Sequence, residues 1–183
     1  MNSRIVVSAI CSALITLIGG CDRGAPAAQP KDAAARDVAA ARIKAIEDLL
    51  PSQSHMMADV GDHFANLWFA GQAENWPLAD FHLGETRSHL RWAVRRIPIR
   101  KDKQGKEVRL VDILAGFENS QLVRLKGAID GKDKVGFEKL YKESLSACYS
   151  CHKAADKPYL RPRIPVEPPS RIINFDPKAD WPL

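Results

Sequence analysis

The segment from Asp133 to Pro158 reads DKVGFEKLYKESLSACYSCHKAADKP, and it decides the fold. Its side chains repeat at three- and four-residue spacing, which places them on one face of a helix. The repeating positions are Phe137, Leu140, Tyr141, Leu145, Cys148 and His152. The pattern predicts a helix that starts near Asp133 and ends at Lys157-Pro158, because proline cannot continue a helix.

Earlier segments show the same helical periodicity and are separated by short connections. We expect helices over 32–50, 54–72, 77–96 and 112–130, the last with a break near Asn119-Ser120. The first could be a helical stalk or part of the first core helix. A basic loop is expected around 101–106, and no convincing strand pairs appear. The fold class predicted is all-α: an antiparallel four-helix bundle over 51–158.

The two ends of the chain have their own character. The tail over 159–183 is expected to be extended, because seven of the twelve prolines lie from Pro158 onward. At the other end, a positive start, an apolar run over 5–18 and Gly19-Gly20 predict a signal peptide over 1–20. The ending before Cys21 resembles the bacterial lipobox, which predicts lipidation of Cys21 and a tether and stalk over 21–50. An ordinary signal peptide cut nearby is the alternative. Either way we expect export to the periplasm, and the lipid would anchor the protein to the membrane.

Composition excludes several classes of function. The chain is 45% hydrophobic and 27% charged, as in globular proteins, with a formal net charge of +5. Its basic residues are scattered, so no nucleic acid partner is expected. No Ser/His/Asp set, phosphate loop or paired carboxylates stand out. We therefore expect a protein that is not an enzyme.

Cysteine placement points to one cofactor. Cys11 falls within the signal peptide and Cys21 at the lipobox, which leaves Cys148 and Cys151 to the mature domain. Together with His152 they form C-x-x-C-H, in which the thiols bind haem through thioethers and the imidazole binds the iron. A zinc site would need more ligands, a thioredoxin-like pair would need strands, and a disulfide would leave His152 unexplained. The motif predicts one haem c per chain.

A C-x-x-C-H motif on the last of four helices resembles the cytochrome c prime superfamily, over roughly Ser54 to Pro158. The resemblance implies that Cys148 and Cys151 are the thioether residues and that His152 is the proximal iron ligand. It also suggests a homodimer. Three features depart from the family pattern: the segment after His152, where an aromatic residue and an arginine are usual, the proline-rich tail, and the block from His63 to Gly71.

The sixth iron ligand is expected from the helix over 54–72. His63 is the first choice, and Met57 or Met56 comes next. An open position is the third alternative. The remaining histidines, His55, His82 and His89, rank below these.

Each alternative implies a different function. Six protein ligands suit an electron carrier with a redox protein partner, whereas five allow binding of nitric oxide or carbon monoxide. A peroxidase-like reaction is a weaker third hypothesis, because no distal acid–base group is identified. Arg161, together with Arg163 and Arg171, could contact the haem propionates or simply keep the tail soluble.

Overall fold

The computed structural model describes residues 30–180, and the chain divides into two compact units between Leu49 and Leu50. The predicted signal peptide and the lipidation predicted at Cys21 lie outside the described residues. Among the helices of residues 30–180, none is both long enough and apolar enough to cross a membrane.

Helix α1, Pro30–Leu49, is exposed along its described length. Even its apolar side chains face water, with Val38 55%, Ile46 61% and Leu49 85% exposed. Its alanine-rich sequence has high helix propensity without packing, and Lys44 pairs with Asp48 at 3.1 Å. Its role as a stalk or as part of a core helix stays a prediction.

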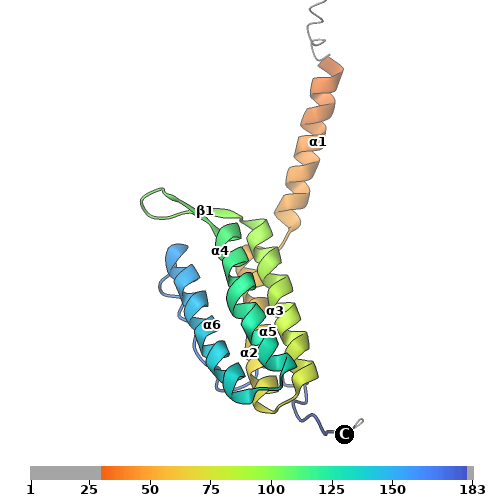
Figure 1. The fold of residues 1–183 in the computed structure, drawn as a ribbon. Helices are drawn as coiled ribbons and strands as arrows, with labels where there is room; N and C mark the ends of the chain where they lie inside the picture. Colours follow the sequence, from red (N-terminus) through yellow and green to blue (C-terminus); the bar gives the residue numbers. More distant parts are fainter. Residues whose placement is uncertain (1–29, 181–183) are drawn as a thin grey trace, which may run out of the picture. The chain divides into compact units, whose positions relative to one another are not determined.

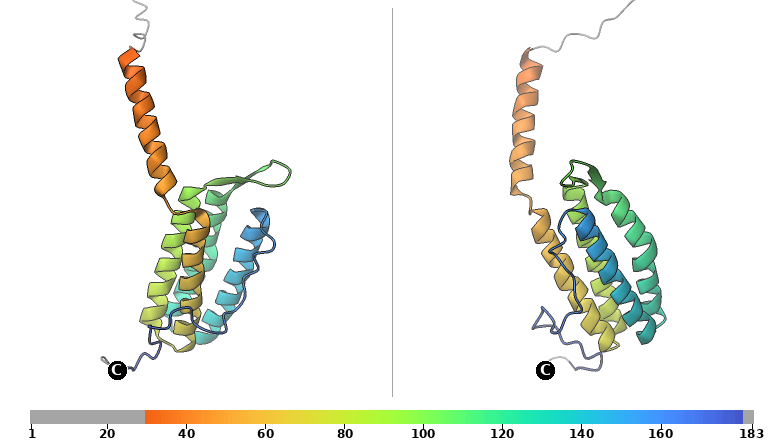
Figure 2. Two further views of the ribbon diagram at one scale, coloured as in Figure 1. Left: turned by 180° about the vertical axis from the view of Figure 1, so that it is seen from behind. Right: turned by 90° about the vertical axis from the view of Figure 1, so that its left-hand side faces the viewer.

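The second unit is mostly helical, which confirms the all-α class. Its helices are α2 (Gln53–Gln72), α3 (Trp76–Arg96), α4 (Leu110–Phe117), a π-helical turn η1 (Glu118–Leu122), α5 (Val123–Asp130) and α6 (Lys134–Ala154). In Figures 1 and 2, α2, α3, the continuous rod α4–η1–α5 and α6 lie alongside one another. Ser52, Asn75 and Asp133 cap the first turns of α2, α3 and α6 by accepting hydrogen bonds from backbone N–H groups.

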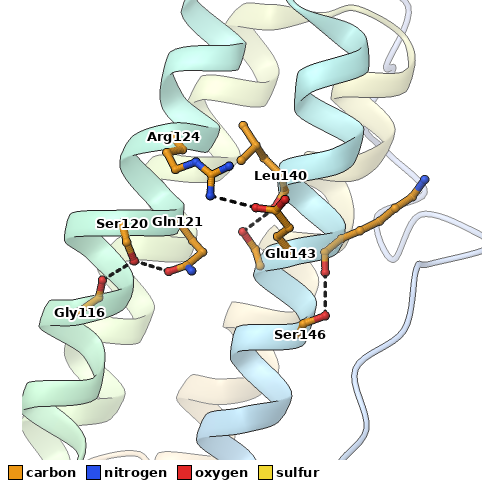
Figure 3. Close-up of polar contacts among 9 residues, drawn as sticks. Gly116, Ser120, Gln121, Arg124, Leu140, Glu143 and Ser146 are labelled. Atoms are coloured by element: carbon orange, nitrogen blue, oxygen red, sulfur yellow. Dashed lines mark hydrogen bonds and ion pairs between the residues drawn. The ribbon is translucent and has the colours of Figure 1, made fainter.

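The break expected near Asn119-Ser120 is a change of helix type. The rod continues through η1, whose wider turn accommodates one extra residue. Ser120 Oγ donates to the Gly116 carbonyl at 2.6 Å and so satisfies a backbone acceptor beside this turn (Figure 3). On the far side of η1, Arg124 forms an ion pair with Glu143 of α6 at 3.0 Å, which ties the rod to the last helix.

A short hairpin between α3 and α4 corrects the expectation that no strands pair. Strands β1 (Ile99–Lys101) and β2 (Glu107–Arg109) are antiparallel, with Arg100 opposite Val108. Asp102 closes the turn, because its carboxylate accepts the N–H groups of Gln104 and Lys106 at 2.9 and 2.8 Å. Local turn chemistry therefore makes a hairpin from strands too short to show periodicity.

The core lies where the apolar faces of α2, α3, η1–α5 and α6 meet. Its buried members are Phe64, Leu67, Ala70, Trp76, Ala79, Leu83, Leu122, Leu125, Ala128, Ile129, Phe137 and Tyr141. Helices α2 and α6 approach closely at Gly71, where a Cβ atom would stand 2.1 Å from Cε1 of Phe137.

The tail after α6 contains no helix or strand through residue 180, as expected from its prolines. It nevertheless packs against the second unit. The Asn75 side-chain amide donates to the Phe175 carbonyl at 3.2 Å, and the rings of Phe69 and Phe175 lie 6.0 Å apart. The tail is therefore part of the folded unit.

Candidate functional site

Helices α2 and α6 run antiparallel, and their contacts fix which residues face each other. At one end Gln72 Nε2 donates to Glu138 at 3.1 Å. Further along, the Tyr141 hydroxyl donates to the Phe64 carbonyl at 2.9 Å, and the two rings stack with centroids 4.4 Å apart. Tyr141 is almost fully buried, and burial raises the pKa of its hydroxyl, which therefore stays protonated as a donor.

The motif residues continue this face of α6 toward its C-terminus. Cys148 and His152 follow Tyr141 by seven and eleven residues. Since successive residues of an ideal helix turn by about 100°, all three are expected to point within about 20° of one direction; of these three, Tyr141 contacts α2. Cys151 lies beside them on the adjacent face. The structure thus brings together the three residues predicted from the sequence.

Both cysteines are free thiols and half-buried. Burial, with a smaller effect of Cys151, raises the pKa of the Cys148 thiol to about 12, and burial also raises the pKa of Cys151. Neither is therefore a reactive thiolate of the redox type. Within residues 30–180, neither belongs to a group of three or more side chains close enough to share a metal ion.

His152 is held by the segment that follows it. Its Nδ1 lies 2.8 Å from the Leu160 carbonyl, which can only accept, so Nδ1 carries a proton and Nε2 is the nitrogen that remains to bind a metal. A turn makes this contact: Asp156 adopts a positive φ of 58°, and the Lys157 N–H donates to the His152 carbonyl at 2.8 Å. The segment that departs from the family pattern therefore orients the imidazole.

On α2, Met57 precedes Phe64 by seven residues, and its side chain is half-buried. In an ideal helix it would point within about 20° of the direction of Phe64, about 10 Å further along. Cys148 follows Tyr141 by the same seven residues on α6. Helix geometry therefore predicts that Met57 and the start of the motif lie at the same level. Met56 is buried in the core on a different face.

His63 lies elsewhere. It points about 100° away from Phe64, and its contacts go to α3: Nδ1 is 3.2 Å from Nδ1 of His82, and its ring stacks on His89 at 5.0 Å. Burial, followed by the charge of His89, lowers the pKa of His63. His55 is exposed and bonded to Ser52.

The tail arginines are all exposed. Arg161 Nε donates to the Pro158 carbonyl at 3.4 Å, which is a contact within the turn. Arg163 and Arg171 line a shallow hollow beside Ala65 of α2. The propionate contact predicted for these residues stays a prediction.

One group of side chains was missed from the sequence. His63, Glu85 and His89 bring one ligand atom each within 4.8 Å of one another. The available signal was spacing: Asp59 precedes His63, and Glu85 precedes His89, by four residues, which places each pair on one helix face.

No protein family model, curated protein or solved structure matches this chain.

Proposed function

We propose that the chain is an exported c-type cytochrome that carries one haem on Cys148, Cys151 and His152 and transfers electrons. The observation that carries the proposal is the arrangement of His152. Its Nδ1–H is fixed on the Leu160 carbonyl, so Nε2 is the nitrogen that remains to bind a metal. His152 directly follows Cys151 in the sequence, and Cys148 and Cys151 are both free thiols. Metal-binding histidines characteristically use their second nitrogen in this way.

The residues present fit the group. Two free cysteines three residues apart on a helix match the double thioether attachment of C-x-x-C-H, and the adjacent imidazole matches the axial ligand. When bound, haem supplies a reversible one-electron iron couple. The protein would hold and orient it on α6, while the neighbouring aromatic core of Phe64 and Tyr141 keeps water from one side.

For the sixth ligand, we now infer Met57 rather than His63. Ideal helix geometry directs Met57 to the same side of α2 as Phe64, whose ring stacks on Tyr141 of α6, whereas the contacts of His63 go to α3. The coordination of an iron held by two strong-field protein ligands would change little between its oxidation states, which suits electron transfer. In this proposal α2, α3, the α4–η1–α5 rod and α6 form an antiparallel four-helix bundle of the cytochrome c prime type. Export and a lipid on Cys21 would place it at the periplasmic face of a membrane.

The test of attachment is expression of the exported chain in a bacterial host that matures c-type cytochromes. We expect one covalent haem per chain, which survives acid–acetone extraction and gives a pyridine haemochrome spectrum. Cys148→Ala with Cys151→Ala should abolish covalent haem, while the control Ser150→Ala, an exposed position between them, should retain it. A wild-type chain without haem in that host refutes the proposal.

The test of ligation is the absorption spectrum of the loaded protein. We expect a low-spin ferrous spectrum and a near-infrared methionine-to-iron band. Met57→Ala should remove the band and permit carbon monoxide binding, and His63→Ala should change neither. A high-spin wild-type spectrum with carbon monoxide binding would replace the electron carrier by the gas-binding alternative.

A further inference from the structure

A second group of potential ligands lies between α2 and α3, away from the face that carries the cysteines. Asp59 and His63 come from α2, and Glu85 and His89 from α3. His63, Glu85 and His89 each bring one ligand atom to within 4.8 Å of the other two. Asp59 adds a carboxylate oxygen 3.9 Å from Nε2 of His89.

The four-residue spacing of these side chains along α2 and along α3 brings them into one group. An acidic residue and a histidine four positions apart share one helix face, and the two such pairs face each other across the α2–α3 contact. Ligands of one tetrahedral ion lie roughly 3.4 Å apart for metal–ligand distances of about 2.1 Å. Small side-chain rotations would therefore bring the three ligand atoms onto one ion without moving either helix.

The second nitrogen of each imidazole already has a partner. His89 Nδ1 donates to the Glu85 backbone carbonyl at 2.9 Å, which leaves Nε2 as the nitrogen available to a metal. His63 Nδ1 lies 3.2 Å from Nδ1 of His82, and a metal on His63 Nε2 would select the tautomer in which Nδ1 donates to His82. Hydrogen bonds of this kind orient metal-binding histidines.

Burial also suits a metal. His63, Glu85 and His89 are half-buried, which leaves a path for an ion from solvent. His82 behind them is 1% exposed, and its Nε2 has no hydrogen-bond partner. Because the His82 ring is buried, it has little room to move, and it holds the His63 ring in place through the contact between their Nδ1 atoms.

We propose that His63, Glu85 and His89 form a binding site for a divalent transition metal, with Zn²⁺ as the best match, which bridges α2 and α3. Two imidazoles and a carboxylate are typical zinc ligands, whereas Mg²⁺ and Ca²⁺ prefer oxygen ligands alone. Water or the Asp59 carboxylate would complete the coordination. The site is distinct from the proposed haem site and does not depend on it.

The experiment is zinc titration of the full chain, purified without a histidine tag and treated with chelator. Equilibrium dialysis followed by elemental analysis should give one zinc per chain, with binding unaffected by millimolar Mg²⁺. His63→Ala and His89→Ala should each weaken zinc binding at least tenfold. The control is His55→Ala, which removes an exposed histidine from the same helix and should leave the affinity unchanged.

Two further measurements keep the result decisive. Glu85→Gln conserves size and should also weaken zinc binding, so it replaces the histidine variants if these fail to fold. The haem absorption spectrum of His63→Ala should be unchanged, since His63 serves zinc and not iron. The proposal is overturned if the wild type binds less than one zinc per chain. It is also overturned if His55→Ala weakens zinc binding while His63→Ala and His89→Ala do not.

Discussion

Gly71 permits a close approach of α2 to α6, so Gly71→Ala is a direct test of how these helices pack. A methyl group at this position would stand 2.1 Å from Cε1, 2.3 Å from Cζ and 2.7 Å from Cδ1 of Phe137. Carbon atoms in contact are normally about 3.5–4.0 Å apart. The ring would therefore have to move by roughly 1 Å or more to make room.

Phe137 has little room to move. It is fully buried, and the rings of Trp68, Trp76 and Tyr141 surround it with centroids 6.0 to 6.3 Å away. An added methyl in such a core costs about 1–3 kcal/mol. The higher helix propensity of alanine offsets up to about 1 kcal/mol, and less in this last turn of α2. We expect Gly71→Ala to lower the free energy of unfolding by about 1–3 kcal/mol.

The assay is equilibrium unfolding in urea, with Gly61→Ala as the matched control. Gly61 lies on the same helix and is exposed, and a methyl group added there would meet no atom within 4 Å. This variant should therefore gain about 0.5–1 kcal/mol from propensity alone. In a double-mutant cycle, Phe137→Leu should recover part of the loss caused by Gly71→Ala. If Gly71→Ala were as stabilising as Gly61→Ala, the close contact with Phe137 would be refuted.

Three further substitutions test other contacts. Tyr141→Phe should cost about 1 kcal/mol in urea unfolding, because it removes the bond to the Phe64 carbonyl; a neutral effect would contradict that bond. Burial lowers the pKa of His82 to about 4 from 6.5, so the unfolded state binds more protons between these values and stability falls by roughly 3 kcal/mol as pH drops through them. His82→Gln should flatten this dependence, and an unchanged pH profile would exclude His82 as its source. Asn75→Ala should cost about 1–2 kcal/mol by removing the cap of α3 and should also increase hydrogen exchange near Phe175; unaltered exchange there would show that the tail docks without Asn75.

The helices were predictable because local sequence determines where they end. Pro51 and Asn75-Trp76-Pro77 bound α2 and α3 closely, and the three- and four-residue spacing of α6 is unambiguous. The hairpin was not predictable from periodicity, since each strand has only three residues and depends on Asp102 and Gly105 in the turn. The docking of the tail through Phe175 was equally hidden, because an extended segment carries no pattern that identifies its partner.

The candidate site was also predictable from the sequence only in part. The sequence alone brought Cys148, Cys151 and His152 together, because they are neighbours on one helix. It could not decide between His63 and Met57, since α2 has more than one buried face. His63 shares a stripe with core residues, yet that side of α2 meets α3 and not α6. The contacts of His63 with α3 are therefore information that the sequence pattern alone does not contain.

The π-helical turn η1 fixes how many residues must lie between α4 and α5 for the apolar side chains of α5 to face the core. The one extra residue that η1 accommodates sets how α5, after Leu122, is rotated relative to α4, which ends at Phe117. Removing one residue there would restore an ordinary helix but rotate everything beyond it by about 100°. Leu125 and Ile129, now buried, would then turn out of the core. Related chains should therefore preserve the number of residues over 118–122, because that number keeps Leu125 and Ile129 in the core.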